Sequence, residues 1–354
     1  MGKDKKNRSS RIKKVVISLG IVITVSLAVT VYSFYKKVFY PNVILNSSTS
    51  TYIFIPTNSS FEDVKLILQS ENILINEASF RWVSDQMNYT NKVLPGRYEI
   101  QQSMSNRELI LLLRSGRQTP INVTFNNIRT IDKLASVISV QLEADSAALI
   151  GLLSNDSFLS EYDLSSETAL SLFIPNTYEF YWNTSARQFV ERMAEEYKDF
   201  WNETRLQQSI KIGLKPTEVS VLASIVEQET SKNDEKALIA GVYMNRYHKG
   251  WKLEADPTLI FAAGDFSIQR VLNVHKEINS PYNTYMYSGF PPGPICMPSI
   301  KSLDAVLNYE QHNYMFFCAR DDFSGYHAFA RTYSQHLVNA RKFQRELNRR
   351  NIRS

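Results

Sequence analysis

The residue best suited to chemistry in this sequence is a glutamate at the end of an apolar helical pattern. The segment 216–230 reads PTEVSVLASIVEQET, and its proline suits the first turn of a helix. At about 3.6 residues per turn, Leu222, Ile225, Val226 and Glu229 lie on one face. A carboxyl group among apolar side chains loses hydration in its charged form, so its pKa rises toward neutrality. Such a group can act as a general acid near neutral pH.

A second glutamate, Glu227, lies on a different face of the same helix. It projects over Ser220, Ala223 and Ser224, which form a smaller and more polar surface. Taken alone, the helix also fits a plainer interpretation, in which a frayed last turn carries two solvated glutamates. The remainder of the chain has to decide between the two.

The sequence lacks the motifs of several other enzyme classes. It contains no Gly-rich phosphate loop ending in Lys-Ser/Thr, no GxSxG elbow and no HExxH. Its five histidines show no metal-ligand spacing, so we expect no metal and no cofactor. Cys296 and Cys318 have apolar neighbours, which fits buried core thiols better than a disulfide scaffold or a catalytic thiol.

The positive charge of the chain is confined to its N-terminus. The net charge of the 354 residues is +5, yet residues 1–14 hold seven basic residues and one acid. The remainder has 33 basic against 34 acidic residues and is essentially neutral. Phosphate binding needs a basic patch that this balance does not supply, so we predict no nucleic-acid partner. An apolar content of 44% also excludes general disorder.

A membrane anchor follows the basic tail. Residues 15–35 are uncharged, and a helix of these 21 residues, rising about 1.5 Å per residue, crosses a hydrocarbon core of about 30 Å. Aromatic residues cluster at its far end, as at a membrane interface. Basic residues are denser before the span than after it, which predicts a single pass with the N-terminus in the cytoplasm. We expect the chain in the plasma (inner) membrane, with everything after about residue 40 periplasmic or otherwise extracytoplasmic.

The pattern of the whole chain predicts an α+β fold. Strand-like and helical stretches alternate in a small domain, which includes a capping box at Ser105 and Glu108. One long helix is expected from Ser185 to about residue 209. In chain order, the predicted parts are a basic tail (1–14), a transmembrane helix (15–35), a linker (36–50), a small α+β domain (51–150), a connecting loop and helix (151–213), and a mixed α/β domain (214–354) with Glu229 at the end of a buried helix.

Six short motifs in the second half of the chain give Glu229 a context. They read IVEQET, GVYMNR, LEADPTLIF, SPYNTY, GFPPGPI and YHAF, in that order. Each is weak alone, but together they resemble the YceG-like family of endolytic murein transglycosylases over nearly the whole chain. The resemblance implies an N-terminal anchor, a LysM-like small domain and a C-terminal catalytic domain. The chain departs from the family pattern at NRY, at LEADPT and at FPPGPICMPS, where Cys296 stands.

The resemblance also implies a reaction. Members cleave the β-1,4 bond between N-acetylmuramic acid and N-acetylglucosamine within a peptidoglycan strand, leave a 1,6-anhydromuramyl end, and so limit the length of nascent strands. One carboxylic acid protonates the glycosidic oxygen and then removes the proton of the sugar's own 6-hydroxyl, so the second carboxylate of ordinary glycosidases is unnecessary. The motif places this acid at Glu229, before Thr230. Glycan strands are the implied partner, with cell-wall synthesis enzymes as further candidates.

The other motif residues suit a sugar groove. Amides and hydroxyls can bond N-acetyl and hydroxyl groups, aromatic rings offer flat faces to sugar rings, and a Pro-Gly loop lets backbone approach a ligand. Core packing and turn formation would explain many of the same residues. The predicted substrate-binding residues are Asn245, Asp256, Tyr282, Asn283, Thr284, Tyr285, Pro292, Gly293, His327 and Phe329.

Three other functions stay open on the sequence. A glycoside hydrolase would use Glu229 together with Asp256, which otherwise fits a helix-capping or turn residue. A cell-wall-binding scaffold would bind glycan without cleaving it. A eukaryotic membrane glycoprotein is suggested only by Asn-x-Ser/Thr sites such as Asn58 and Asn88, and these are expected by chance in a chain rich in Asn, Ser and Thr.

Overall fold

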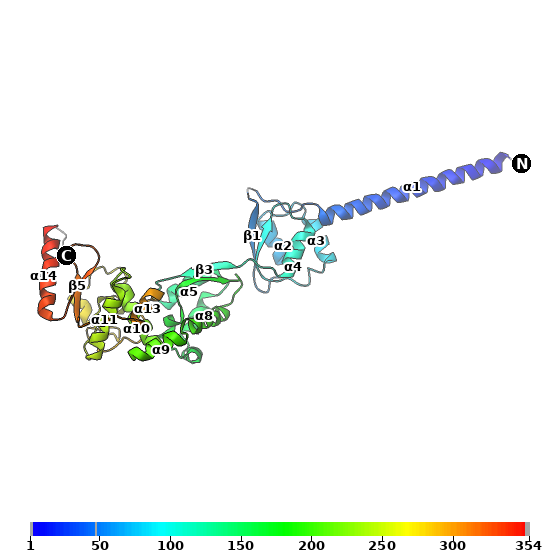
Figure 1. Ribbon diagram of the computed structural model, residues 1–354. Helices are drawn as coiled ribbons and strands as arrows, with labels where there is room; N and C mark the ends of the chain where they lie inside the picture. The colour runs from blue at the N-terminus through cyan, green and yellow to red at the C-terminus, as the bar shows by residue number, and fades with distance from the viewer. Residues whose placement is uncertain (1–2, 47, 351–354) are drawn as a thin grey trace. The chain divides into compact units, whose positions relative to one another are not determined.

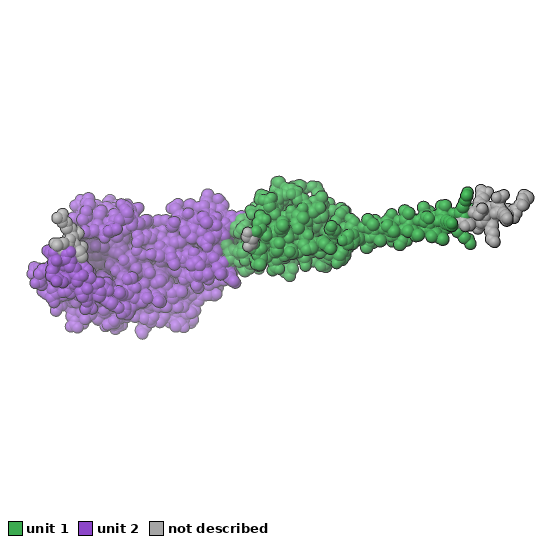
Figure 2. All heavy atoms as spheres, turned by 90° about the horizontal axis from the view of Figure 1, so that it is seen from above, with its two compact units in different colours: residues 1–121, 180–183 green, residues 122–179, 184–354 purple. Residues whose placement is uncertain are grey.

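The computed structural model describes residues 3–46 and 48–350, and these divide into two compact units (Figures 1 and 2). Unit 1 comprises residues up to 121 together with 180–183, and unit 2 comprises residues 122–179 and 184 onward. Helices and short strands occur in both units, which confirms the predicted α+β class. Apart from residues 180–183, unit 1 extends to residue 121, whereas the small domain was predicted to extend to residue 150.

The first helix contains the predicted span. Helix α1 covers Lys3–Phe39, and within its stretch Arg11–Phe39 an 18-residue window has a mean hydropathy of 2.4 and no residue buried inside the protein. By length and composition this stretch can cross a membrane.

After α1 in the chain, unit 1 folds around a small antiparallel sheet. Strands β1 and β2 pair from Ser50↔Gln101 to Ile55↔Gly96, and their alternate side chains enter the core with those of the helices. Ser105 caps α4 with the predicted capping box, and Gly116 ends that helix in the left-handed region at φ 67°. The elements of unit 1 after α1 are β1 (Ser50–Ile55), α2 (Phe61–Ser70), α3 (Glu77–Gln86), β2 (Gly96–Gln101) and α4 (Asn106–Ser115).

The segment after the span differs from the predicted linker. Helix α1 continues to Phe39, Val38 is buried in the core of unit 1, and Asn106 donates a 2.9 Å hydrogen bond to the carbonyl of Lys37. Val43 forms a β-bridge with Leu74. Residues 36–50 were predicted to be a linker, but Val38 and Val43 in the first part of this segment are buried in the core of unit 1. The anchor helix therefore enters unit 1 without a free spacer.

Unit 2 is mainly helical. The predicted long helix from Ser185 is wrong, because Trp201 leaves the helical region (φ −81°, ψ 53°) and Asn202 caps a new helix. In the described chain its elements are β3 (Ile121–Phe125), α5 (Ile131–Gln141), α6 (Ser146–Leu153), α7 (Asp156–Leu159), η1 (Ser160–Tyr162), η2 (Ala169–Leu172), β4 (Asn176–Phe180), α8 (Ala186–Phe200), α9 (Glu203–Ile212), α10 (Pro216–Glu229), α11 (Lys236–His248), α12 (Asp256–Ala263), η3 (Asn273–Glu277), α13 (Ile300–Leu307), β5 (Phe316–Ala319), β6 (His327–Ala330) and α14 (Tyr333–Arg349).

The core of unit 2 is built around α10, which packs against α11 and α13. The strands β5 and β6 form an antiparallel pair with the register Phe316↔Ala330 to Ala319↔His327, and β3 pairs with β4. The whole middle of α10 is buried, so its last turn is held in a fixed position.

Candidate active site

Helix α10 brings Glu229 to a fixed position at its C-terminal end. Pro216 occupies the first turn, Glu218 accepts a 2.7 Å hydrogen bond from the backbone N–H of Lys215, and residues 219–226 are all buried. Glu229 is the last helical residue and follows the apolar stripe predicted from the sequence. It lies at the negative end of the helix dipole, which disfavours a charged carboxylate.

The pKa of the Glu229 carboxyl group is strongly raised, from 4.5 to about 7. Burial is the largest cause of the rise, the hydrogen bond from the Tyr243 hydroxyl opposes it, the negative charge of Asp256 adds to it, and the charge of Arg246 opposes it. Tyr243 donates a 2.5 Å hydrogen bond to Oε1 of Glu229. A carboxyl group with a pKa near neutrality can both deliver and accept a proton at working pH.

Glu229 opens onto a pocket of about 410 Å³ that we call the Glu229 pocket. Its walls come from the end of α10, from α11, from the loop before α12, and from β5, β6 and α14. Its lining residues are Glu229, Tyr243, Arg246, Leu253, Glu254, Asp256, Tyr285, Phe316, Phe317, Cys318, Ala319, His327, Tyr333 and His336. The predicted residues Glu229, Asp256, Tyr285 and His327 thus line one pocket.

Asp256 and Tyr285 are held together across this pocket. The Tyr285 hydroxyl donates a 2.6 Å hydrogen bond to Oδ1 of Asp256. Thr284 holds residues 254–255 in place with two hydrogen bonds. Its hydroxyl accepts from the backbone N–H of Ala255 at 3.0 Å, and its carbonyl accepts from the backbone N–H of Glu254 at 3.1 Å. The SPYNTY and LEADPT motifs therefore form one structural unit that presents an exposed carboxylate to the pocket.

Arg246 forms part of the pocket wall and is largely buried. Its guanidinium donates to the carbonyls of Met315 (2.8 Å) and Leu253 (2.7 Å), and it forms an ion pair with Glu254 at 3.2 Å. It fixes the loop before α12 to the residue that precedes strand β5, and it places a positive charge near Glu229.

Glu227 is not a solvated glutamate. Its Oε2 accepts hydrogen bonds from Lys236 Nζ (2.7 Å), from the Ser299 hydroxyl (2.5 Å) and from the Ser302 hydroxyl. These donors lower the pKa of Glu227 against the effect of burial, and Lys236 itself is buried. The plainer interpretation of two solvated glutamates is wrong, because one is in an ion-pair network and the other is desolvated.

The other predicted substrate-binding residues do not line the Glu229 pocket. Asn245 donates to the carbonyls of His312 (2.8 Å) and Tyr314 (2.9 Å), and buried Asn283 donates to those of Lys276 and Ile278. These contacts give both amides a role in holding loops.

Four more predicted residues lie outside the pocket lining. Tyr282 packs its ring on Phe261, and Phe329 packs beside Phe317. Pro292 is exposed, whereas a Cβ at Gly293 would lie 1.8 Å from the carbonyl oxygen of Glu167, so this position admits only glycine.

Sequence reasoning missed Tyr243 and Arg246. Both lie on α11 in the GVYMNR motif, three residues apart and therefore on one face of the helix. A tyrosine and an arginine in a largely apolar, buried helix were the available signal, because such polar groups need partners. Their actual partners come from α10 and β5 and are not visible in the local pattern.

Neither cysteine forms a disulfide. Cys296 is buried, and burial raises its pKa to about 12, while Gln228 donates to its sulfur at 3.3 Å. Cys318 is partly buried in the pocket wall. Burial keeps both thiols protonated, as expected for structural rather than nucleophilic cysteines.

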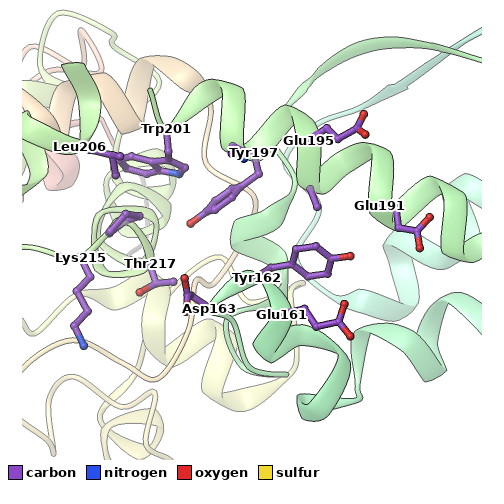
Figure 3. Close-up of a pocket in the computed structure, with 13 residues that line it drawn as sticks. Glu161, Tyr162, Asp163, Glu191, Glu195, Tyr197, Trp201, Leu206, Lys215 and Thr217 are labelled. Carbon is purple, nitrogen blue, oxygen red and sulfur yellow. The ribbon is translucent and has the colours of Figure 1, made fainter. Parts of the chain in front are cut away.

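A larger hollow of about 1120 Å³ lies elsewhere in unit 2 (Figure 3). It is lined from η1, α8, α9 and the start of α10, with Tyr197, Trp201 and Asp163 facing its interior. Glu229 is not among its lining residues. The smaller Glu229 pocket is the candidate active site because it contains the carboxyl group with the raised pKa.

The structure thus combines an N-terminal apolar helix long enough to cross a membrane with a pocket that contains a carboxyl group whose pKa is raised to about 7. The sequence matches the YceG-like family over residues 53–342, and the chain belongs to that family.

Named relatives agree with this assignment. The chain is similar to the endolytic murein transglycosylase of Bacillus subtilis, with 26% identity over 85% of this chain and 87% of the relative. That of Streptococcus pneumoniae is 25% identical over 88% of this chain and 62% of the relative. A crystal structure of a YceG-like protein from Listeria monocytogenes is 25% identical, with a TM-score of 0.56 over 82% of this chain and 99% of that one.

Proposed function

We propose that this chain is an endolytic peptidoglycan lytic transglycosylase in which Glu229 is the catalytic acid and base. The observation that carries the proposal is the pKa of about 7 for Glu229, in a pocket that also presents Tyr243 and His327. The names of the relatives give the substrate, the murein strand.

Two proton transfers at Glu229 complete the reaction. The protonated carboxyl group gives its proton to the oxygen that links N-acetylmuramic acid to N-acetylglucosamine. The bond between this oxygen and C1 of N-acetylmuramic acid then breaks. The carboxylate then takes the proton of the muramyl 6-hydroxyl, whose oxygen closes the 1,6-anhydro ring at C1. Glu229 ends protonated as it began, and no water is consumed.

Tyr243 prepares Glu229 for both steps. Burial raises the pKa of Tyr243 well above its ordinary value, so its hydroxyl stays a donor throughout the working range. It holds Oε1 in place and leaves Oε2 to face the substrate. The donor also limits how far burial raises the pKa of Glu229, which keeps the carboxylate accessible for the second transfer.

The test is the replacement Glu229→Gln. The amide keeps the volume and accepts the Tyr243 hydrogen bond, but it has no proton to transfer. Release of anhydromuropeptides from peptidoglycan, followed by mass spectrometry, should fall at least about 10²–10⁴-fold. Wild-type release by this variant would contradict the assignment.

A glycoside hydrolase using Glu229 and Asp256 is the second candidate, because both carboxylates line the same pocket. It would leave reducing ends in place of anhydro ends, so the same mass spectra separate the two enzymes. A binding scaffold would release neither product.

We also propose the predicted topology, with α1 as a single-pass anchor, the N-terminus in the cytoplasm, and unit 2 on the outer side of the membrane. The basic residues ahead of the apolar stretch support this orientation. A reporter fused after residue 354 should be active only outside the cytoplasm. Unit 1, with its own core, we assign as the LysM-like domain that positions glycan near the membrane.

A further inference from the structure

Glu235 is a buried carboxylate with no part in the reaction as described above. It lies at the start of α11 with only 6% of its surface exposed. Both of its oxygens bind one residue: Oε1 accepts from the backbone N–H of His327 at 2.7 Å, and Oε2 contacts Nδ1 of the His327 ring at 2.8 Å. His327 begins strand β6 and lines the Glu229 pocket.

The chemistry of this pair fixes the protonation of the ring. An ionised carboxylate can only accept hydrogen bonds, so Nδ1 of His327 must carry a proton to meet Oε2. In the neutral ring the other nitrogen, Nε2, is then an acceptor. Phe317 packs edge-on against the ring, with centroids 5.3 Å apart and planes at 85°, and so restricts its rotation.

We propose that Glu235 is a positioning residue: it holds His327 as the Nδ1–H tautomer, so that Nε2 accepts a hydrogen bond from a hydroxyl or amide N–H of the amino-sugar substrate in the Glu229 pocket. The inference rests on the proposed function for the identity of the substrate. The tautomer itself is a property of the free protein and can be measured without substrate.

Glu235→Gln is the discriminating variant. Its side-chain oxygen can still accept from the backbone N–H of His327, so the brace between α11 and β6 survives. Its NH₂ group would face Nδ1, however, and can only donate, so Nδ1 must become an acceptor and the proton must move to Nε2. A structural brace alone would be preserved by this change, whereas the tautomer would be inverted.

Asp234→Asn is the matched control. Asp234 is the neighbouring exposed acid, and it accepts from the Tyr326 hydroxyl at 3.0 Å, whereas the His327 ring contacts Glu235. The control removes the same charge from the same loop. We expect it to leave both the His327 tautomer and kcat/KM within about twofold of the wild type, as for most surface substitutions.

The first measurement is ¹⁵N NMR of histidine-labelled full-length protein in detergent micelles, at about pH 9, where an ordinary imidazole is neutral. His327→Gln identifies the resonances of His327 among those of the five histidines. We expect a protonated Nδ1 and an unprotonated Nε2 in the wild type and in Asp234→Asn, and the reverse in Glu235→Gln. An Nε2–H ring in the wild type would overturn the proposal, even if the Gln variant fails to fold.

The second measurement is the kinetics of anhydromuropeptide release. Loss of one hydrogen bond to substrate predicts a fall of about 10–100-fold in kcat/KM for Glu235→Gln. His327→Gln should fall by a similar factor, and the double variant should be no worse than His327→Gln, because Glu235 acts through His327. Additive losses would overturn the proposal. If instead Glu229→Gln keeps full activity, the proposed function fails while the tautomer result stands.

Discussion

The Tyr243 hydroxyl donates to Oε1 of Glu229 across 2.5 Å, joining the last residue of α10 to the middle of α11. Both residues are desolvated, so the hydrogen bond is strong, and the carboxylate has few other ways to offset the loss of water. The hydrogen bond from Tyr243 is therefore the largest influence that opposes the rise in the pKa of Glu229 caused by burial.

Replacing Tyr243 by Phe should move the pH profile of activity. The hydroxyl lowers the pKa of Glu229, so its removal lets burial raise that pKa above about 7. The basic limb of the profile of kcat/KM against pH, where the general acid loses its proton, should move to higher pH. The maximum value of kcat/KM should also fall, because the carboxyl group is no longer held in one orientation. A limb that stays in place would show that another group controls it.

Glu229→Gln should stabilise the fold in a pH-dependent way. Because the folded pKa (about 7) exceeds the unfolded value of 4.5, the ionisation of Glu229 costs nothing below about pH 4.5 and destabilises the folded state increasingly as pH rises through 7. A difference of this size corresponds to on the order of 3 kcal/mol. Urea unfolding of the two proteins should give similar stability near pH 4.5 and a more stable variant above about pH 8. Equal stability at both pH values would contradict the raised pKa.

Lys236→Met should be strongly destabilising, although it lies outside the Glu229 pocket. It leaves Glu227 partly buried without the cation that lowers its pKa. Breaking a buried pair typically costs about 3–5 kcal/mol. Glu227→Gln should cost less, because an amide can still accept from the two serines. Thermal unfolding measures both, and activity per folded molecule should stay near wild type for Glu227→Gln.

The two glutamates of α10 show which features of the site can be predicted from the sequence. The helical period of α10 predicted that Glu229 follows the apolar stripe, and the structure agrees. The same period placed Glu227 on a small polar face of its own helix, whereas its carboxylate accepts hydrogen bonds from Ser299 and Ser302, which lie beyond that helix. The ion pair of Glu227 with Lys236, and the contact of Glu229 with Tyr243, join residues on two helices whose packing no local pattern specifies. The same holds for Glu235 and His327, which lie 92 positions apart.

Elements with strong local signals were predicted closely. The start of α4 lies where the capping box at Ser105 and Glu108 placed it. The break at Trp201 and the docking of Val38 depend on tertiary packing, and both were missed. Tyr285 and Asn283 were both predicted to bind sugar because of their side-chain chemistry. That chemistry does not reveal that Tyr285 lines the pocket whereas Asn283 holds its own loop.

Truncation near the anchor should show that α1 is part of unit 1. Removing residues 1–40 deletes Val38 from the core and the Lys37 carbonyl that accepts from Asn106. Removing only residues 1–30 keeps both. The shorter deletion should be the more stable by about 1.5–3 kcal/mol, the value of one buried aliphatic side chain. Equal melting temperatures for the two proteins would show that the segment before residue 40 contributes nothing to folding.

Asp256→Asn should separate the transglycosylase from the hydrolase. In the transglycosylase, Asp256 acts on Glu229 only through its charge, which raises the pKa of that carboxyl group. The neutral variant should lower the pKa of Glu229, move the basic limb of the activity profile to lower pH, and still release only anhydro ends. In a hydrolase, Asp256 would activate water or form the covalent bond, and its loss would abolish cleavage, while the wild type would give reducing ends.

Glu254→Gln is the matched control: it removes another exposed charge from the Glu229 pocket, but one that is not among the causes of the raised pKa. It should therefore leave the position of the limb unchanged. A limb that moves equally in both variants would mean that the overall charge of the pocket, and not Asp256 itself, sets the acidity of Glu229.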